Sequence, residues 1–278
     1  MAGAGAVNGS LIGSLPDRVR KLGPVCCVSY RVASRIANTL GGGFAVRSAQ
    51  ELNSAAVVLF HAPPDQVESL LAILHAPDVD WKGRSLVVCD CEIDEGSVAR
   101  LRGAGASVAT ARRFELPGYL VVNGNGTALA AAIRIARELK LRPIEVGEAT
   151  EHAFDAAVTL GTCALTPLLD SAATLLREAG VRELDAPRLA AALFQKTARE
   201  YAHSGTQSWG WYTRSPEAKQ LEGEIAGAGR DVGPVLRQLM LLGMDVFGKH
   251  LDVAEVVRGA QSKAGEQGRA GLKIESHP

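Results

Sequence analysis

An unbroken apolar run meets a proline turn at residues 57–65, which read Val57-Val58-Leu59-Phe60-His61-Ala62-Pro63-Pro64-Asp65. Successive apolar residues, rather than alternating ones, are typical of a parallel strand buried on both faces. The prolines and Asp65 then favour a turn into a helix over residues 65–74. We therefore predict a strand–turn–helix unit here, and similar units recur along the first half of the chain.

These units predict the fold class. Apolar runs predict strands at residues 24–30, 44–47, 55–60, 85–91, 107–109, 119–123 and 143–146. Helices are expected between them, at residues 32–40, 65–74, 96–103 and 127–139. Strands that alternate with helices of this length form βαβ units, and right-handed crossovers arrange them as a doubly wound, mostly parallel α/β sheet. Such a sheet binds its ligand at the carboxyl ends of the strands.

The pattern changes near Gly147, and no convincing strand follows up to Lys249. Helices are predicted at residues 149–180, in one piece or broken near Pro167, and at 186–203, 217–225 and 232–250. Asp185 is a plausible N-cap for the helix at 186–203. We expect an α/β domain at residues 1–147, an all-helical domain at 148–258 and a disordered tail at 259–278.

Composition and charge argue against several partners. Thirty basic and thirty acidic residues cancel, so nothing favours nucleic acid or an anionic membrane. No apolar run is long enough to span a bilayer, and the N-terminus does not have the pattern of a secretory signal. Five cysteines, mostly in apolar runs, favour reduced thiols in a cytoplasmic protein. The pair Cys89 and Cys91 lacks a second ligand pair at zinc spacing, so we expect no metal.

A glycine-rich stretch opens the chain as Gly3-Ala4-Gly5-Ala6-Val7-Asn8-Gly9, and residues 10–15 can continue it as a helix. Glycines at this spacing let the backbone approach a pyrophosphate, whose charge meets the N–H groups at the start of the helix. The candidate cofactor-binding residues are therefore Gly3, Gly5, Ala6 and Val7. Only Met1 and Ala2 precede this stretch, so we expect the first strand to be missing, through a truncated start or a degenerate site.

The segment at the end of residues 24–30 indicates which dinucleotide is bound. An acidic residue after the second strand favours NAD, whereas arginine accommodates the 2′-phosphate of NADP. This segment has no acidic residue, and its polar candidates are Ser29, Arg31, Ser34 and Arg35. We interpret them as NADP-binding, with NAD less favoured; the alternative is that they are solvated residues of a helix start. The next strand end would place three more residues beside the cofactor: His61, Ala62 and Pro63.

Together these segments resemble two-domain reductases of the 6-phosphogluconate dehydrogenase-like superfamily, and most of all the pyrroline-5-carboxylate reductase-like proteins. The resemblance rests on GAGAVNG (3–9), VSYR (28–31), ASRIANTL (33–40), VVLFHAPPDQV (57–67) and FDAAVTLG (154–161). The chain is also similar, more loosely, to Rossmann-like proteins of the DUF2520 type. The resemblance implies a Rossmann-like NADP-binding domain, a helical domain that forms a homodimer, and an active site between the domains.

Two segments depart from pyrroline-5-carboxylate reductases. Their G-S-G-P-A segment is replaced by Gly161-Thr162-Cys163-Ala164-Leu165, and their S-P-G-G-T-T loop by Ser215-Pro216-Glu217-Ala218-Lys219. The backbone amides and threonine hydroxyl that would hold a small carboxylate are thus missing. Proline synthesis is not supported, and the substrate class stays open.

Proton donors for hydride-transfer chemistry are expected on the first helix of the second domain. His152 and Asp155 are three residues apart and share a helix face, which threonines extend. The predicted catalytic residues are His152, Asp155 and Thr159, against the alternative that the helix start is simply exposed. The predicted substrate contacts are Thr162, Arg214 and Ser215, with Arg214 facing an anionic group.

Three functions remain open from the sequence. The leading prediction is an NADP(H)-dependent oxidoreductase that acts on a small-molecule substrate, either a carbonyl or an imine. The second is a catalytically inactive nucleotide-binding or scaffold homologue, which the altered segment 215–219 favours. The third is a structural helical-dimer protein with no ligand.

Overall fold

The computed structural model describes residues 2–3, 10–16, 21–208 and 218–247. The chain divides into two compact units, Met1–Ala157 and Val158–Pro278. The sequence suggests a boundary at residue 147, where the last strand ends, whereas the first unit also includes the start of the helix that follows. The predicted tail at 259–278 lies outside the described residues.

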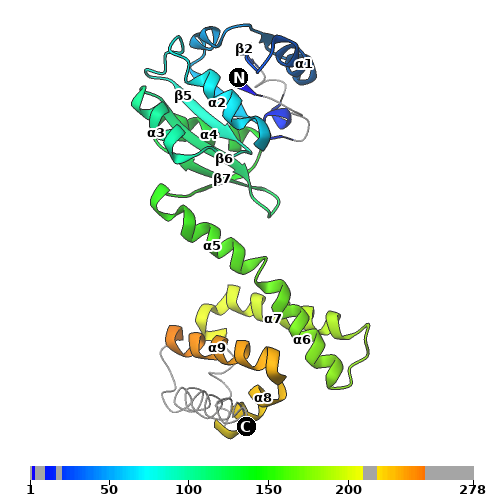
Figure 1. The fold of residues 1–278 in the computed structure, drawn as a ribbon. Coiled ribbons are helices and arrows are strands. Elements are labelled where there is room, and N and C mark those ends of the chain that lie inside the picture. The colour runs from blue at the N-terminus through cyan, green and yellow to red at the C-terminus, as the bar shows by residue number, and fades with distance from the viewer. Residues whose placement is uncertain (1, 4–9, 17–20, 209–217, 248–278) are drawn as a thin grey trace, which may run out of the picture. The chain divides into compact units, whose positions relative to one another are not determined.

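The first unit is built on a six-stranded sheet in the order β1-β4-β5-β6-β7-β8 (Figure 1). Its strands are β1 (Ala2–Gly3), β4 (Val57–His61), β5 (Ser85–Cys89), β6 (Ser107–Arg113), β7 (Tyr119–Gly124) and β8 (Arg142–Glu145). Neighbouring strands are parallel except β6 and β7, which are antiparallel. The predicted α/β fold with a mostly parallel sheet is confirmed.

The first strand is present, which corrects the expectation that it would be missing. Ala2 and Gly3 pair with the last two residues of β4. Strand β2 (Pro24–Val25) pairs with β3 (Phe44–Ala45), and these two form a separate parallel sheet. A groove of about 490 Å³ is lined by the starts of β2, β3 and β4 together with helix α4. Strand β1 reaches only the carboxyl end of β4. In the described part of the chain, no strand therefore lies between the amino ends of β2 and β4.

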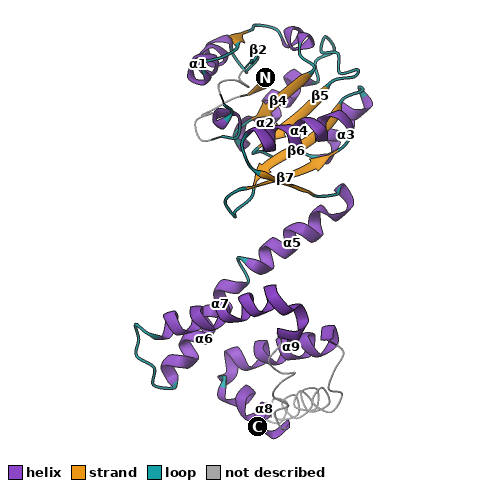
Figure 2. Cartoon of the chain, turned by 180° about the vertical axis from the view of Figure 1, so that it is seen from behind, coloured by secondary structure: helices purple, strands orange, loops and turns teal. Residues whose placement is uncertain are grey.

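Helices cover both faces of the main sheet (Figures 1 and 2). Helices α1 (Tyr30–Leu40) and α4 (Gly126–Glu138) pack on one face, and α2 (Val67–Leu74) and α3 (Glu95–Gly103) on the other. Every residue of β5 is buried: Val87 and Cys89 join the first core cluster, and Leu86 and Val88 the second. This two-sided burial explains why β5 is an unbroken apolar run in the sequence.

Local signals at both ends define α1. The Ser29 hydroxyl accepts a hydrogen bond from the Val32 backbone N–H at 3.3 Å, and Gly41 ends the helix with a φ of 64°. A cap of this type satisfies an N–H group that the helix cannot pair, and glycine adopts a positive φ without strain. The strand predicted at 24–30 is shorter than expected because Ser29 already serves as this cap.

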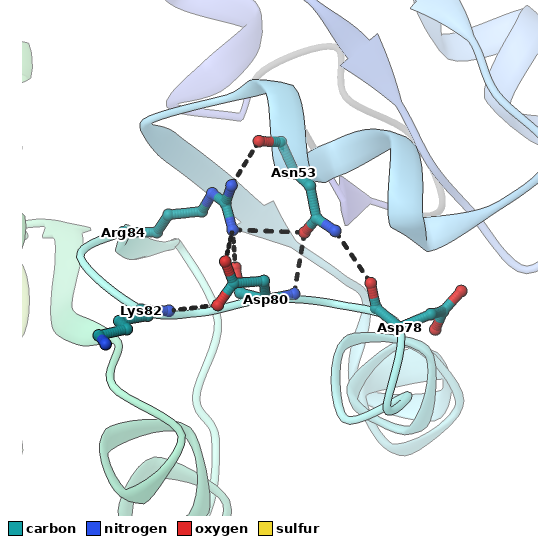
Figure 3. Close-up of polar contacts among 5 residues, drawn as sticks. All are labelled: Asn53, Asp78, Asp80, Lys82 and Arg84. Atoms are coloured by element: carbon teal, nitrogen blue, oxygen red, sulfur yellow. Dashed lines mark hydrogen bonds and ion pairs between the residues drawn. The ribbon is translucent and has the colours of Figure 1, made fainter.

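A polar network lies at the amino end of β5 (Figure 3). The Arg84 guanidinium donates to the Asn53 backbone carbonyl at 2.5 Å and forms an ion pair with Asp80 at 3.3 Å. The Asn53 side chain accepts the Asp80 N–H at 2.9 Å and donates to the Asp78 carbonyl at 2.9 Å. These contacts connect the loop before β5 to the segment before β4, so they are structural in role.

The second unit is helical, as predicted. Its helices are the end of α5 (Glu151–Gly161), then α6 (Leu165–Glu178), α7 (Ala186–Ser204), α8 (Ala218–Gly227) and α9 (Gly229–Phe247). The break between α5 and α6 falls at residues 162–164. Pro167 lies in the first turn of α6, where backbone N–H groups make no hydrogen bond within the helix, so proline is tolerated there. Asp185 precedes α7 but makes no side-chain cap; its carboxylate pairs with Arg182 at 2.5 Å instead.

Residues 148–178 are long and apolar enough to cross a membrane by length and composition alone, contrary to the expectation that no such run exists. Only 6% of the most apolar window is buried. This stretch is broken at residues 162–164, and Glu151 and Asp155 pair with side chains of the sheet. One such stretch in the described residues is weak grounds for a membrane segment.

Candidate functional site

The carboxyl ends of the parallel strands gather at one edge of the first unit. In the main sheet these ends are Gly3 of β1, His61 of β4, Cys89 of β5 and Arg113 of β6. Cys26 and Val46, which follow β2 and β3, pack in the same buried cluster as Phe60. We call this region the carboxyl edge, and doubly wound sheets bind ligands there.

The glycine-rich segment begins at this edge. Gly3 ends β1, while the other predicted cofactor residues, Gly5, Ala6 and Val7, lie outside the described residues. Beyond them, Ser10, Leu11 and Ile12 are buried. The helix predicted at residues 10–15 was wrong in type: this segment forms a single 3-10 turn at Ile12–Ser14. Its packing against the core fixes where the glycine-rich segment ends.

The predicted NADP-binding residues lie around the start of α1. Arg31 and Arg35 are exposed, Ser34 is half-buried, and the Ser29 hydroxyl is already engaged as the helix cap. A further arginine was missed by the sequence reasoning, which placed Arg47 inside a strand. It follows β3, and its guanidinium carbon lies 4.4 Å from the ring centroid of Tyr30. The sequence did offer a signal for Arg47, because it is a basic residue close behind a short apolar run.

His61 and Ala62 lie where β4 ends. The Nδ1 atom of His61 is 2.9 Å from the carbonyl oxygen of Cys89; since that oxygen only accepts, Nδ1 carries the proton. Ala62 is buried and Pro63 is half-buried. Burial is the main cause that raises the pKa of the Cys89 and Cys91 thiols.

Asp90, directly after β5, is a second residue that the sequence reasoning did not assign to the site. Its backbone has a φ of 50°. Its carboxylate accepts the Leu11 N–H at 2.6 Å and the Arg113 N–H at 3.3 Å. The Arg113 guanidinium in turn donates to the Ser10 carbonyl at 3.0 Å and to the Ser14 hydroxyl at 2.6 Å. The sequence did offer a signal for Asp90, because it is a charged residue between Cys89 and Cys91 at the end of an apolar run.

The start of α5 is tied to the first unit by side-chain contacts along β6 and β7. Glu151 accepts a hydrogen bond from Asn123 of β7 at 2.6 Å. Asp155 pairs with Arg112 of β6 at 2.5 Å. The ring of Phe154 lies 5.8 Å from that of Phe114, which directly follows β6. The middle of α5 thus reaches the carboxyl edge.

The predicted catalytic residues differ in their surroundings. His152 and Thr159 are exposed on α5, whereas Asp155 is half-buried and held by Arg112. The Thr162 hydroxyl donates to the Val158 carbonyl at 2.8 Å, inside its own helix. The other two predicted substrate contacts, Arg214 and Ser215, lie outside the described residues. Asp155 is therefore the predicted catalytic residue that the described contacts bring to the carboxyl edge.

A second cavity, of about 530 Å³, belongs to the helical unit. It is lined by α6 and α7 and is almost entirely apolar, with Leu165, Leu169, Phe194 and Tyr201 among its residues. The lining has no charged side chain, and its polar groups are the amide of Gln195 and the hydroxyls of Thr197, Tyr201, Thr206 and Ser208. An apolar cavity of this kind is suited to receive an apolar side chain from another segment.

Comparison with known proteins supports the fold. No protein-family model matches the sequence, and no curated protein matches it. Solved structures do match. A Bacteroides fragilis protein, provisionally described as an NADP oxidoreductase, is 14% identical with a TM-score of 0.64, covering 92% of this chain and 96% of its own.

Two better-characterised structures are also similar. A variant imine reductase from Myxococcus stipitatus in complex with NAD+ is 18% identical with a TM-score of 0.57, covering 95% of this chain and 93% of its own. A reductive aminase from Aspergillus terreus in complex with NADPH and ethyl levulinate is 16% identical with a TM-score of 0.52, covering 92% and 97%. At these identities the likeness establishes the fold, while the finer resemblance to pyrroline-5-carboxylate reductases stays a prediction.

Proposed function

We propose that this protein binds NADP(H) at the carboxyl edge and is an NADP(H)-dependent oxidoreductase acting on a small carbonyl or imine. The observation that carries the proposal is the set of arginines around the start of α1. Residues 25–40 contain no acidic side chain, and Arg31, Arg35 and Arg47 lie on the two segments that follow β2 and β3. In a dinucleotide-binding unit this is where a 2′-phosphate distinguishes NADP from NAD.

Arg47 is well suited to this task. The ring of Tyr30 holds its guanidinium from one side, and the side chain remains exposed. A planar guanidinium can donate two parallel hydrogen bonds to a phosphate, and it keeps its charge at any physiological pH. A preorganised arginine loses less conformational entropy on binding, so we expect Arg47 to contribute more than Arg31 or Arg35.

The similar structures also support the binding of a nicotinamide cofactor. The imine reductase and the reductive aminase were each solved with a nicotinamide cofactor, and both cover more than nine-tenths of this chain. When bound, NADPH supplies the hydride, and the protein orients the substrate and delivers a proton. His152 of α5 is the proposed proton donor, because an imidazole ring nitrogen can deliver a proton to a reacting group and this side chain is exposed.

Calorimetric titration with NADPH and NADH tests cofactor binding. We expect the wild type to prefer NADPH, and Arg47→Glu to weaken NADPH binding by about tenfold or more while NADH binding changes little. Arg188→Glu is the matched control, since it makes the same charge change on an exposed arginine of α7. Equal affinity of the wild type for both cofactors would contradict the NADP assignment.

A second candidate is a nucleotide-binding protein without catalysis. It is favoured by the pairing of Asp155 with Arg112, because this contact occupies the carboxylate that would otherwise be available to a substrate. Oxidation of NADPH in the presence of small cyclic imines and ketones separates the two candidates. Binding of NADPH with no turnover of any such substrate, in the wild type and in His152→Ala alike, would support the second.

We also propose that the helical unit forms a homodimer and that the protein is cytoplasmic. Several large apolar side chains of this unit are exposed, among them Leu160, Leu193 and Tyr201. Helix α7, which carries the last two, also lines the apolar cavity. A second copy would cover these residues. The described cysteines form no disulfide with one another, which fits a reducing compartment.

A further inference from the structure

Asp90 has a backbone conformation that most residues avoid. With a φ of 50° it lies in the left-handed region, where a side chain crowds its own backbone. Glycine would occupy this position without strain, and the short polar side chain of aspartate is among the few that tolerate it. A strained residue at the carboxyl edge therefore needs a reason in what its side chain does.

The Asp90 carboxylate bridges three separate segments of the chain. One oxygen accepts the Leu11 N–H at 2.6 Å and the other accepts the Arg113 N–H at 3.3 Å. Its own backbone N–H still donates to the Ala111 carbonyl at 3.0 Å, so the β5–β6 pairing continues through it. The left-handed turn is what allows the carboxylate to reach back while the backbone stays in register.

Arg113 adds a second connection to the same segment. Its guanidinium donates to the Ser10 carbonyl at 3.0 Å and to the Ser14 hydroxyl at 2.6 Å. Together with the Asp90–Leu11 bond, these contacts hold residues 10–14 against the ends of β5 and β6. We call the contacts of Asp90 and Arg113 with residues 10–14 the clamp.

The clamp lies at one end of the glycine-rich segment. At the other end, Gly3 is paired in the sheet with His61. Fixing the ends of a binding segment before the ligand arrives removes part of the entropy that binding would otherwise cost.

We propose that Asp90 is a positioning residue for the cofactor: through the clamp it holds residues 10–14 at the carboxyl edge, where NADP(H) is proposed to bind. This inference rests on the proposed function, because it presupposes that the carboxyl edge binds a dinucleotide. In this role Asp90 acts through the backbone N–H groups of Leu11 and Arg113.

Asp90→Gly tests the role directly, since it removes the carboxylate and relieves the backbone strain together. We expect it to fold normally, to exchange the Leu11 amide hydrogen faster, and to bind NADPH about tenfold more weakly. Asp90→Asn keeps one acceptor oxygen, so it should fall between the wild type and Asp90→Gly in both measurements. Asp94→Asn is the matched control, because Asp94 also accepts a backbone N–H, from Ser97, but caps α3 instead.

The outcomes separate the two proposals. If the wild type binds NADPH and Asp90→Gly binds it equally well, the positioning role is overturned and the proposed function stands. An unchanged Leu11 exchange rate in Asp90→Gly would overturn the clamp itself. If the wild type binds neither NADPH nor NADH, the proposed function fails and the positioning role fails with it.

Discussion

The two units of this protein bury their apolar residues to very different degrees. In the first unit, β5 is completely buried and large side chains such as Phe60 and Leu86 are 0% exposed. In the second unit, the described residues of α6 include one buried side chain, Ala173, and those of α7 only Ala186 and Ala190. Leu193 on α7 remains 49% exposed. The first unit completes its core within one chain, and the second leaves apolar surface to be covered.

The difference follows from architecture. A sheet with helices on both faces closes its core in three layers, whereas a few helices that pack in pairs each leave one face open. The sequence patterns of the two halves are similarly apolar, so composition alone does not show which half completes its own core. The following predictions test this contrast.

The largest expected effect is the loss of a buried side chain from the first unit. Leu86→Ala should lower the free energy of unfolding by about 3 kcal/mol, because it deletes methyl groups and leaves a cavity in a packed layer. Urea unfolding followed by fluorescence of the buried Trp81 measures it. The loss should not depend on protein concentration, whereas the effect of the matched change Leu193→Ala should. Equal, concentration-independent losses would contradict the contrast between the units.

The second effect concerns assembly. We expect Leu193→Glu combined with Tyr201→Glu to convert a dimer to a monomer, because charges would be buried without partners in an apolar interface. Light scattering after size-exclusion chromatography measures the mass. Leu116→Glu serves as the control, since Leu116 is a 60% exposed leucine of the first unit. A wild type that is monomeric at all concentrations would refute the proposed dimer.

A smaller effect is expected where α5 joins the sheet. Arg112→Ala removes the partner of Asp155, and both side chains are more than a third exposed, so the cost should stay below about 1 kcal/mol. A double-mutant cycle with Asp155→Asn isolates the pair from other changes. A coupling of zero would show that the ion pair does not hold α5, leaving the Asn123–Glu151 hydrogen bond and the contact between Phe154 and Phe114 as its attachments.

The smallest effect is a pH dependence at the start of α3. Two hydrogen bonds that the Asp94 carboxylate accepts from Ser97 lower the pKa of Asp94. The larger effect comes from the Ser97 side chain and the smaller from the Ser97 backbone N–H. The contribution of Asp94 to stability is therefore present above the unfolded pKa of about 3.9 and is lost as pH falls through the lower folded value. Acid titration of unfolding should show a slightly shallower loss for Asp94→Asn than for the wild type. Identical acid profiles would show that the cap adds no pH-dependent stability.

The sequence by itself determined the features that depend on near neighbours. The order of strands and helices and the end of the helix at residues 32–40 follow from apolar periodicity and from the glycines that come next. The same local reasoning found the glycine-rich segment and the basic residues Arg31 and Arg35, because their chemistry is written in consecutive residues.

Only the tertiary structure decided the features whose partners are far apart in the chain. Asp90 meets Leu11 across 79 residues, and Asp155 meets Arg112 across 43. Tyr30 and Arg47 come together only because β2 and β3 pair, and the antiparallel β7 depends on how β6 turns back. Such pairings are set by the packing of whole layers and by the closure of long loops. No local pattern of residues encodes them, because many arrangements satisfy the same periodicity.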